Sequence, residues 1–143
     1  MRTSDQANLQ IAALVEQLAR RVQNLCFTKD LAPVQWSAMR YFAQAGQSAR
    51  TVTGLTAYSG VNQSSATRTV QLLAEKGLIE IQREGRFKRI SLSEKGRQTL
   101  DRDPLKRLAY AIDALDPGAQ VVLRDLLAAL LLELHPRPFK EQG

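Results

Sequence analysis

Cysteine is almost absent from this sequence of 143 residues, because Cys26 is the single cysteine. One cysteine excludes an intrachain disulfide framework and a cysteine-rich metal site. Histidine is equally scarce, with His135 alone near the end of the chain. No HExxH, phosphate-binding glycine loop or CxxC motif occurs. The sequence therefore predicts no enzyme activity, no catalytic residue, no metal site and no cofactor.

Long apolar runs are also missing. The longest run, Leu126–Leu132, falls far below the roughly 20 residues that a membrane-spanning helix needs. The first residues lead into an amphipathic pattern and lack the uninterrupted apolar core of a signal peptide. We therefore expect a cytoplasmic protein without a membrane partner.

Positive charge is what the sequence does have, and it is concentrated in one segment. The chain carries a formal net charge of +6. Residues 50–97 hold nine Lys or Arg against four Asp or Glu, whereas the flanking segments are close to neutral. DNA binds to such a basic block because each phosphate contact releases condensed counterions. The charge distribution thus favours a polyanion as the partner.

Apolar periodicity predicts long helices toward both ends of the chain. Over residues 5–26, apolar residues recur every three or four positions, which is typical of a helix packed on another helix. Two helices are predicted near the other end, over residues 93–115 and 116–134, the last one ended by Pro136 and Pro138. A helix over residues 33–45 is predicted to begin at Pro33 and to bury Val34, Trp36, Met39, Tyr41 and Phe42.

Three consecutive elements occupy the basic segment. A short helix over residues 53–59 is anchored by Leu55 and closed by Gly60. The next helix begins at the N-cap Asn62 and ends at Gly77, with one apolar and one polar face. Alternating residues 78–84 and 89–93 around a turn at 85–88 predict a β-hairpin. The predicted fold class is mainly α with a small β-hairpin wing, a winged helix-turn-helix with N- and C-terminal dimerisation helices.

The order of these elements predicts a site for double-stranded DNA. The second helix of a helix-turn-helix enters the major groove, where Gln can pair with adenine and Arg with guanine. A cationic hairpin turn beside it can reach the DNA backbone or a narrow minor groove. The candidate DNA-binding residues are Thr53, Gln63, Ser64, Ser65, Thr67, Arg68, Arg83, Arg86 and Lys88.

These motifs resemble the MarR family of bacterial transcriptional regulators over about residues 31–100. Leu31–Trp36 is similar to the family's opening of the second helix, and Val61–Arg68 to the start of its recognition helix. Leu73–Leu78 resembles the exit into the wing, and Leu92–Gly96 the segment after the wing. The wing itself differs: it is a few residues shorter, and Glu84-Gly85-Arg86 stands where the family has Asp-x-Arg.

The resemblance implies a homodimer whose terminal helices interlock, so that two winged domains straddle a palindromic operator. Ser64, Thr67 and Arg68 match recognition-helix positions, and Arg86 matches the wing arginine. The expected organisation is a dimerisation helix over 1–30, a winged helix-turn-helix over 31–97 and C-terminal dimerisation helices over 98–143. We expect a nucleoid-associated transcriptional regulator, a repressor released by a small ligand. The alternative from another class is a winged-helix module that binds only protein, which would expose apolar anchors in place of the polar face.

Two kinds of signal are compatible with the sequence. A small-molecule effector would bind a pocket walled by Phe27, Trp36, Met39 and Tyr41, although such a cluster at helical spacing also suits a core. Alternatively, Leu25-Cys26-Phe27 is similar to the peroxide-sensing members of the family, in which a cysteine oxidises and DNA is released. In those members the cysteine lies near the start of the first helix. A lone cysteine on a helix is otherwise a small buried hydrophobe.

Overall fold

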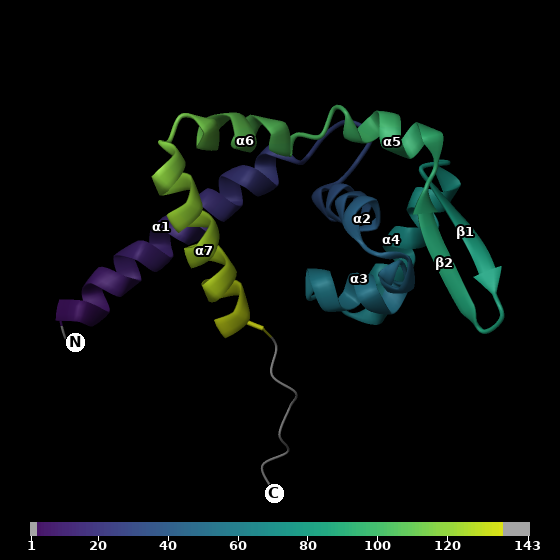
Figure 1. Ribbon diagram of the computed structural model, residues 1–143, viewed down its shortest axis with the longest axis horizontal. Helices are drawn as coiled ribbons and strands as arrows, with labels where there is room; N and C mark the ends of the chain where they lie inside the picture. Colours follow the sequence, from purple (N-terminus) through teal and green to yellow (C-terminus); the bar gives the residue numbers. More distant parts are fainter. Residues whose placement is uncertain (1–2, 136–143) are drawn as a thin grey trace, which may run out of the picture.

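Helix α2 (Pro33–Gln44) forms the centre of the structure, because the side chains of Trp36, Met39 and Phe42 are almost completely buried. The computed structural model describes residues 3–135. Leu73 and Ile90, which come from a helix and a strand packed around α2, complete the core. The elements that pack against α2 are α3 (Val52–Ser59), α4 (Gln63–Glu75), β2 (Phe87–Leu92) and α5 (Glu94–Leu100) (Figure 1). Strand β1 (Ile79–Glu84) pairs with β2, and η1 (Gln47–Ala49) adjoins α3.

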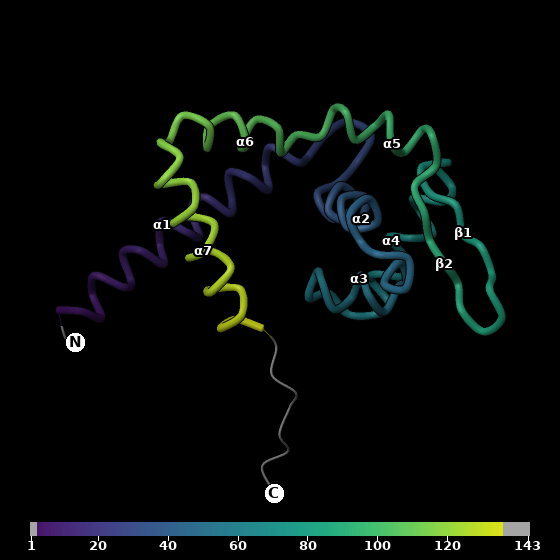
Figure 2. The backbone as a smooth tube through the Cα atoms, viewed as in Figure 1, coloured from purple at the N-terminus to yellow at the C-terminus, as the bar shows by residue number. Residues whose placement is uncertain are grey.

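The remaining helices of the described residues lie mostly outside this core. They are α1 (Thr3–Leu25), α6 (Leu105–Asp113) and α7 (Pro117–Glu133). Figure 2 traces α5 and α6 along one edge of the molecule, and α7 turning sharply at the end of α6. No residue of α1, α6 or α7 is fully buried, and many of their apolar side chains are open to solvent. Within the described residues, none of the helices is long and apolar enough to cross a membrane.

Helix starts and ends predicted from the sequence are confirmed by their capping contacts. The Asn62 side chain accepts a hydrogen bond from the Ser65 N–H at 2.8 Å, and the Asp116 carboxylate accepts one from the Ala119 N–H at 2.9 Å. Gly60 has a φ of 71°, the left-handed conformation that glycine adopts without strain after a helix. The mainly α fold with one antiparallel hairpin is confirmed as well. Pro136 and Pro138 lie outside the described residues.

The prediction of one continuous helix over residues 93–115 is wrong. The chain tightens after Leu100, since the Asp103 N–H bonds to the Leu100 carbonyl oxygen three residues back. Pro104 follows and has no N–H to continue the helix. The Asp103 carboxylate then accepts a hydrogen bond from the Leu105 N–H at 2.9 Å, which starts α6. Two shorter helices, α5 and α6, therefore replace the predicted one.

Two smaller predictions are also wrong. The hairpin turn comprises only Gly85 and Arg86, because Glu84 already pairs with Phe87. Gly85 has a φ of 60°, which suits the first position of a tight two-residue turn. Phe87 and Lys88 therefore belong to β2. Val34 was predicted to be buried but is 52% exposed, because it lies on the face of α2 opposite Trp36.

Candidate nucleic-acid interface

The turn between α3 and α4 is held by short-range hydrogen bonds. Thr51 caps α3 by accepting a hydrogen bond from the Gly54 N–H at 3.0 Å. Asn62 caps α4, and its side-chain oxygen also accepts a hydrogen bond from the Ser64 hydroxyl at 2.8 Å. Gly60, between the two helices, supplies the left-handed residue that reverses the chain. These contacts set the direction in which the first turn of α4 presents its side chains.

Helix α4 buries Ala66, Val70 and Leu73, as predicted, and leaves two polar sides open. Gln63, Ser64 and the half-buried Thr67 share one of them with Gln71. The other side carries the exposed Ser65 and Arg68, which border a hollow of about 550 Å³ whose walls include Pro33 and Val34 of α2. Thr53 is exposed on α3. The structure thus divides the predicted helix residues between two adjoining surfaces.

The hairpin is apolar where it joins the core and cationic toward its turn. On one face Ile79 pairs with Leu92 and Ile81 with Ile90, and most of these side chains enter the core. Two residues further, the same face carries Arg83 opposite Lys88, both exposed. Like charges directly opposite each other destabilise a hairpin, and within the described residues no carboxylate forms an ion pair with either cation. The hairpin therefore projects a concentrated positive charge beyond the core.

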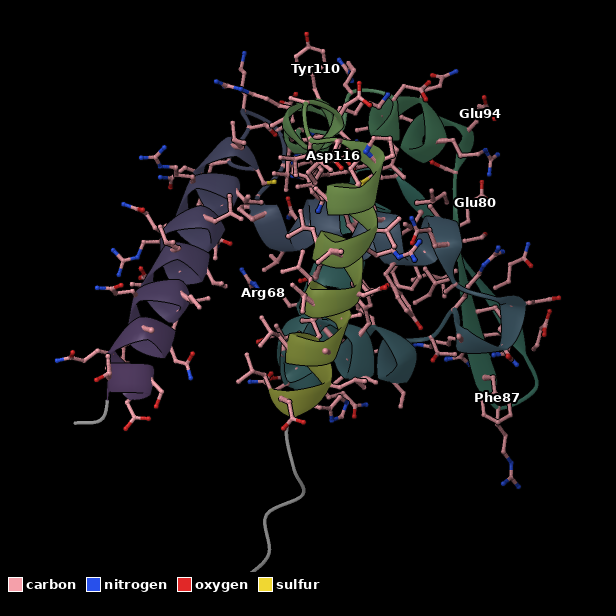
Figure 3. All side chains as sticks on the ribbon, turned by 60° about the vertical axis from the view of Figure 1, so that its left-hand side comes forward. Arg68, Glu80, Phe87, Glu94, Tyr110 and Asp116 are labelled. Carbon is pink, nitrogen blue, oxygen red and sulfur yellow. The ribbon has the colours of Figure 1, made fainter. Side chains whose placement is uncertain are left out.

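Backbone contacts tie the hairpin to the connection between α2 and α3. The Ile90 N–H donates to the Arg50 carbonyl oxygen at 2.9 Å, and the Arg89 guanidinium donates to the Ser48 carbonyl oxygen at 3.0 Å. Arg89 also lies 3.6 Å from the Glu84 carboxylate and covers the ring of Phe87. Figure 3 shows Phe87 near the end of the hairpin, well separated from Glu80 at its base. The base is anchored, while Arg86 at the turn is exposed to solvent.

The predicted effector residues do not form a single wall. Phe27 is 64% exposed, whereas Met39 is completely enclosed in the core. The Trp36 indole N–H donates to the Thr28 hydroxyl at 3.1 Å. Tyr41 donates its hydroxyl hydrogen to the Ala49 carbonyl oxygen and stacks near Tyr58; burial raises the pKa of this phenol. Among the four residues, Trp36 borders an open hollow.

Cys26 is buried just after α1, beside a partly buried ion pair that the sequence did not predict. The Arg40 guanidinium donates two hydrogen bonds of 2.7 Å to the Asp103 carboxylate. The same guanidinium lies 3.6 Å from the Cys26 sulfur. Burial alone would raise the pKa of the Asp103 carboxyl, but hydrogen bonds from Arg40 and the Leu105 N–H outweigh it and hold this pKa below its usual value. The ion pair joins α2 to the break between α5 and α6.

Sequence reasoning missed this ion pair because its partners are 63 positions apart, and neither belongs to a local motif. It also missed that Lys76, Lys95 and Arg102 converge on one hollow. In the part of the chain that the structure describes, no three His, Cys, Asp or Glu side chains are grouped closely enough to hold a metal ion.

Comparison with known proteins shows which family this arrangement resembles. Residues 29–90 match the model of the MarR family. A MarR family protein from Bacillus stearothermophilus has a TM-score of 0.69 at 22% identity, over 95% of this chain and 99% of that one. A probable transcriptional regulator from Pseudomonas aeruginosa has a TM-score of 0.65 at 26% identity, over 84% of this chain and 96% of that one.

A third similar structure is that of Bordetella bronchiseptica BpsR, whose DNA binding is regulated by 6-hydroxynicotinic acid. It has a TM-score of 0.67 at 14% identity, over 85% of this chain and 98% of that one. No curated protein sequence matches the chain. The family match covers α2, α3, α4, β1 and most of β2, the elements that build the helix-turn-helix and its wing. The winged helix-turn-helix of this chain therefore matches the MarR family over residues 29–90.

Proposed function

We propose that this protein is a transcriptional repressor that binds a palindromic DNA operator as a homodimer and is released by a small ligand. The observation that carries the proposal is the pair of Arg83 and Lys88, opposite each other beyond the core and without a carboxylate partner among the described residues. Such an arrangement costs stability in the free protein, and phosphate groups would neutralise it. The polar face of α4 beside it suits base edges in the major groove.

Each predicted contact has a place in this proposal. Gln63, Ser64 and Thr67 would face the bases, because they share the polar side of the first turns of α4. Arg86 would reach the minor groove from the hairpin turn. Thr53, Ser65 and Arg68 lie on adjoining surfaces and would contact the backbone or flanking bases. A module that binds only protein would more often expose apolar anchors at these positions.

Homodimerisation would cover the apolar faces of the outer helices. Leu14 of α1 is 65% exposed, and Leu131 and Leu132 of α7 are 71% and 77% exposed. Neither helix contains a buried residue. Large apolar patches of this kind are rare on monomers, and a second copy of the chain offers the same self-complementary surface. We propose residues 1–30 and 98–143 as the dimerisation segments, and 31–97 as the DNA-binding domain.

The experiment that tests this function combines sedimentation with a gel shift on genomic fragments. We expect a dimer at micromolar concentration and retarded fragments that contain an inverted repeat, with half-site centres about 10 bp apart. A stable monomer that still binds DNA tightly would contradict the homodimer. Failure to retard any fragment would favour the protein-binding module.

The remaining parts of the proposal follow from the family. The similar proteins are described as transcriptional regulators, which supports a protein without enzyme activity, acting in the cytoplasm on the nucleoid. Regulation of BpsR by 6-hydroxynicotinic acid supports release by a small ligand. No cofactor is part of the proposed mechanism.

Replacing Arg86 by alanine is expected to weaken operator binding by about 1–3 kcal/mol, because one charged DNA contact is lost. The affinity should be measured at several salt concentrations, where the slope against salt should fall by about one ion. Arg97→Ala removes the same charge from an exposed site on α5 and should leave operator affinity unchanged. If Arg86→Ala and the unmodified protein bound the operator with equal affinity, Arg86 of the wing would not contact DNA.

Cys26→Ser is expected to lower stability by about 1 kcal/mol and to leave operator binding intact, because Cys26 is 3% exposed and packs in the core. We propose this structural role over peroxide sensing. The check is operator binding by both proteins before and after treatment with an organic hydroperoxide. If peroxide released the unmodified protein but not the serine variant, the sensing role would be correct.

A further inference from the structure

A hollow of about 610 Å³ opens between the α1–α2 connection, the end of α4 and helix α5. Its volume lies within the range of small-molecule sites in proteins. In Figure 1, α5 and the α1–α2 connection lie at the upper edge of the winged domain, whereas the hairpin turn points to the opposite edge. The hollow is therefore well removed from the wing turn that would contact DNA.

Four cations surround this hollow: Lys29, Lys76, Lys95 and Arg102. Asp30 is the one acidic residue among its lining, so the lining carries a net charge of +3. Within residues 3–135, none of these cations forms an ion pair with a carboxylate. A cluster of like charges without counterions is unfavourable in the empty protein and favours binding of an anion.

The donors of the hollow are already directed by the fold. The Lys76 ammonium donates to the Asp30 carbonyl oxygen and, at 3.3 Å, to the Gln35 side chain. The Lys95 ammonium donates to the Lys76 carbonyl oxygen at 3.0 Å. These acceptors are uncharged, so both ammonium groups keep their full charge and further N–H donors. The turn that connects α4 to β1 supplies the Lys76 carbonyl oxygen that holds the Lys95 ammonium.

The floor of the hollow is apolar. It is formed by the edges of Leu31, Trp36 and Leu78, whose side chains otherwise belong to the core. The Trp36 indole N–H is already bonded to the Thr28 hydroxyl. A ligand would therefore place its carbon skeleton on this floor and its charged groups toward the rim.

From this combination we infer that the hollow binds a compact organic dianion, in which two acidic groups contact Lys95, Lys76 and Arg102 and an apolar body covers the Trp36 edge. A single negative charge would leave most of the positive rim unmatched. A bare inorganic anion would leave the apolar floor in water. Binding does not depend on the proposed DNA contacts, so it can be tested in the absence of DNA.

The test is calorimetric titration of the full chain with phthalate, benzoate and inorganic phosphate. Phthalate and benzoate share the ring and differ by one carboxylate, whereas phosphate carries charge without an apolar body. We expect phthalate to bind about tenfold more tightly than either of the others, since one more charge-assisted contact contributes roughly one factor of ten. Trp36 is the single tryptophan, so a change in its fluorescence locates phthalate at the hollow.

Variants separate this site from general attraction by a basic protein. Lys95→Gln combined with Arg102→Gln should weaken phthalate binding at least about tenfold and abolish the fluorescence change. Arg83→Gln combined with Lys88→Gln removes the same charge from the hairpin and should alter phthalate binding less than about twofold, because exposed charges at that distance are screened. If the double variant does not fold, Arg102→Gln alone replaces it in the test and should also weaken phthalate binding. It should fold normally, since no side-chain hydrogen bond of Arg102 is present among the described residues.

Several results would overturn the inference. Equal affinities for phthalate and benzoate would exclude a dianion site, and equal affinities for phthalate and phosphate would exclude a role for the apolar floor. The same loss of phthalate binding in both double variants would show nonspecific charge attraction. If phthalate did not bind the unmodified protein and the Lys95→Gln, Arg102→Gln double variant lost operator binding, these cations would be DNA contacts and not part of a dianion site.

Discussion

Replacing Asp103 by asparagine is expected to lower the free energy of unfolding by about 2 kcal/mol, because it leaves the partly buried Arg40 guanidinium without a counter-charge. This is less than the roughly 3–5 kcal/mol expected for a fully buried pair. The side chains of Arg40 and Asp103 are 17% and 15% exposed, so solvent can replace the lost partner only in part. Asparagine also places an N–H donor against the donors of the guanidinium. Urea unfolding at a fixed protein concentration measures the change, since dimerisation would otherwise contribute.

The same ion pair predicts how stability depends on pH. The pKa of Asp103 is lowered in the folded protein, so the folded state is stabilised when this side chain is a carboxylate. Its contribution to stability is present above the ordinary aspartate pKa of about 4 and is lost as the pH falls through the lowered folded value. Asp103→Asn should therefore lose stability less steeply on acidification than the unmodified protein. Parallel acid titrations of the two proteins would show instead that the ion pair contributes nothing.

An exposed ion pair provides the control. Glu94 lies 3.2 Å from Arg97, and both side chains are mostly in solvent. Glu94→Gln makes the same change from acid to amide and should cost less than about 1 kcal/mol, as exposed pairs usually do. A similar loss in both variants would mean that burial of the Arg40–Asp103 pair does not strengthen it.

Replacing Gly96 by alanine is expected to lower the free energy of unfolding by about 3 kcal/mol, the upper end for overpacking a core position. Gly96 is buried at the start of α5, and an added Cβ would overlap the Leu78 carbonyl oxygen and touch the Leu92 side chain. A backbone carbonyl cannot move aside as a flexible side chain can. Here the same carbonyl also accepts the Ser93 N–H at 3.0 Å. Thermal unfolding would show the effect directly.

Gly46 offers the matched control for this substitution. It lies between α2 and η1 with a φ of −63°, and an added Cβ would meet no atom within 4 Å. Gly46→Ala should leave stability unchanged or raise it slightly, because alanine restricts the unfolded chain. If both variants were equally unstable, the close approach of α5 to Leu78 would not be the cause.

The substitutions Asp103→Asn and Gly96→Ala both act on the connection between the winged domain and the outer helices. Gly96 lets α5 pack closely against the turn before β1. The Arg40–Asp103 pair holds the residues between α5 and α6 against α2. In the proposed dimer these contacts would set the separation of the two recognition helices. A loss of stability here should therefore accompany weaker operator binding, even though neither residue would touch DNA.

Local sequence patterns determined most of the helices and the resemblance to the MarR family. Apolar spacing predicted α1, α2, α4 and α7 to within a few residues, because the side chains that form one face of a helix lie three or four positions apart. Capping at Asn62 and Asp116 needs partners only three residues away, so it too could be predicted. The ordered motifs that resemble the MarR family lie within residues 29–90 or just beyond them.

Only the tertiary structure decided which residues meet across the chain. The break at Asp103 is stabilised by Arg40 from α2, and the cations of the dianion hollow come from three separate segments. The two polar sides of α4 differ because α2 borders only one of them, the side that carries Arg68. Such pairings depend on the path of the backbone between distant residues. Residue spacing cannot predict that path, because many loop conformations bring different partners together at nearly equal cost in chain entropy.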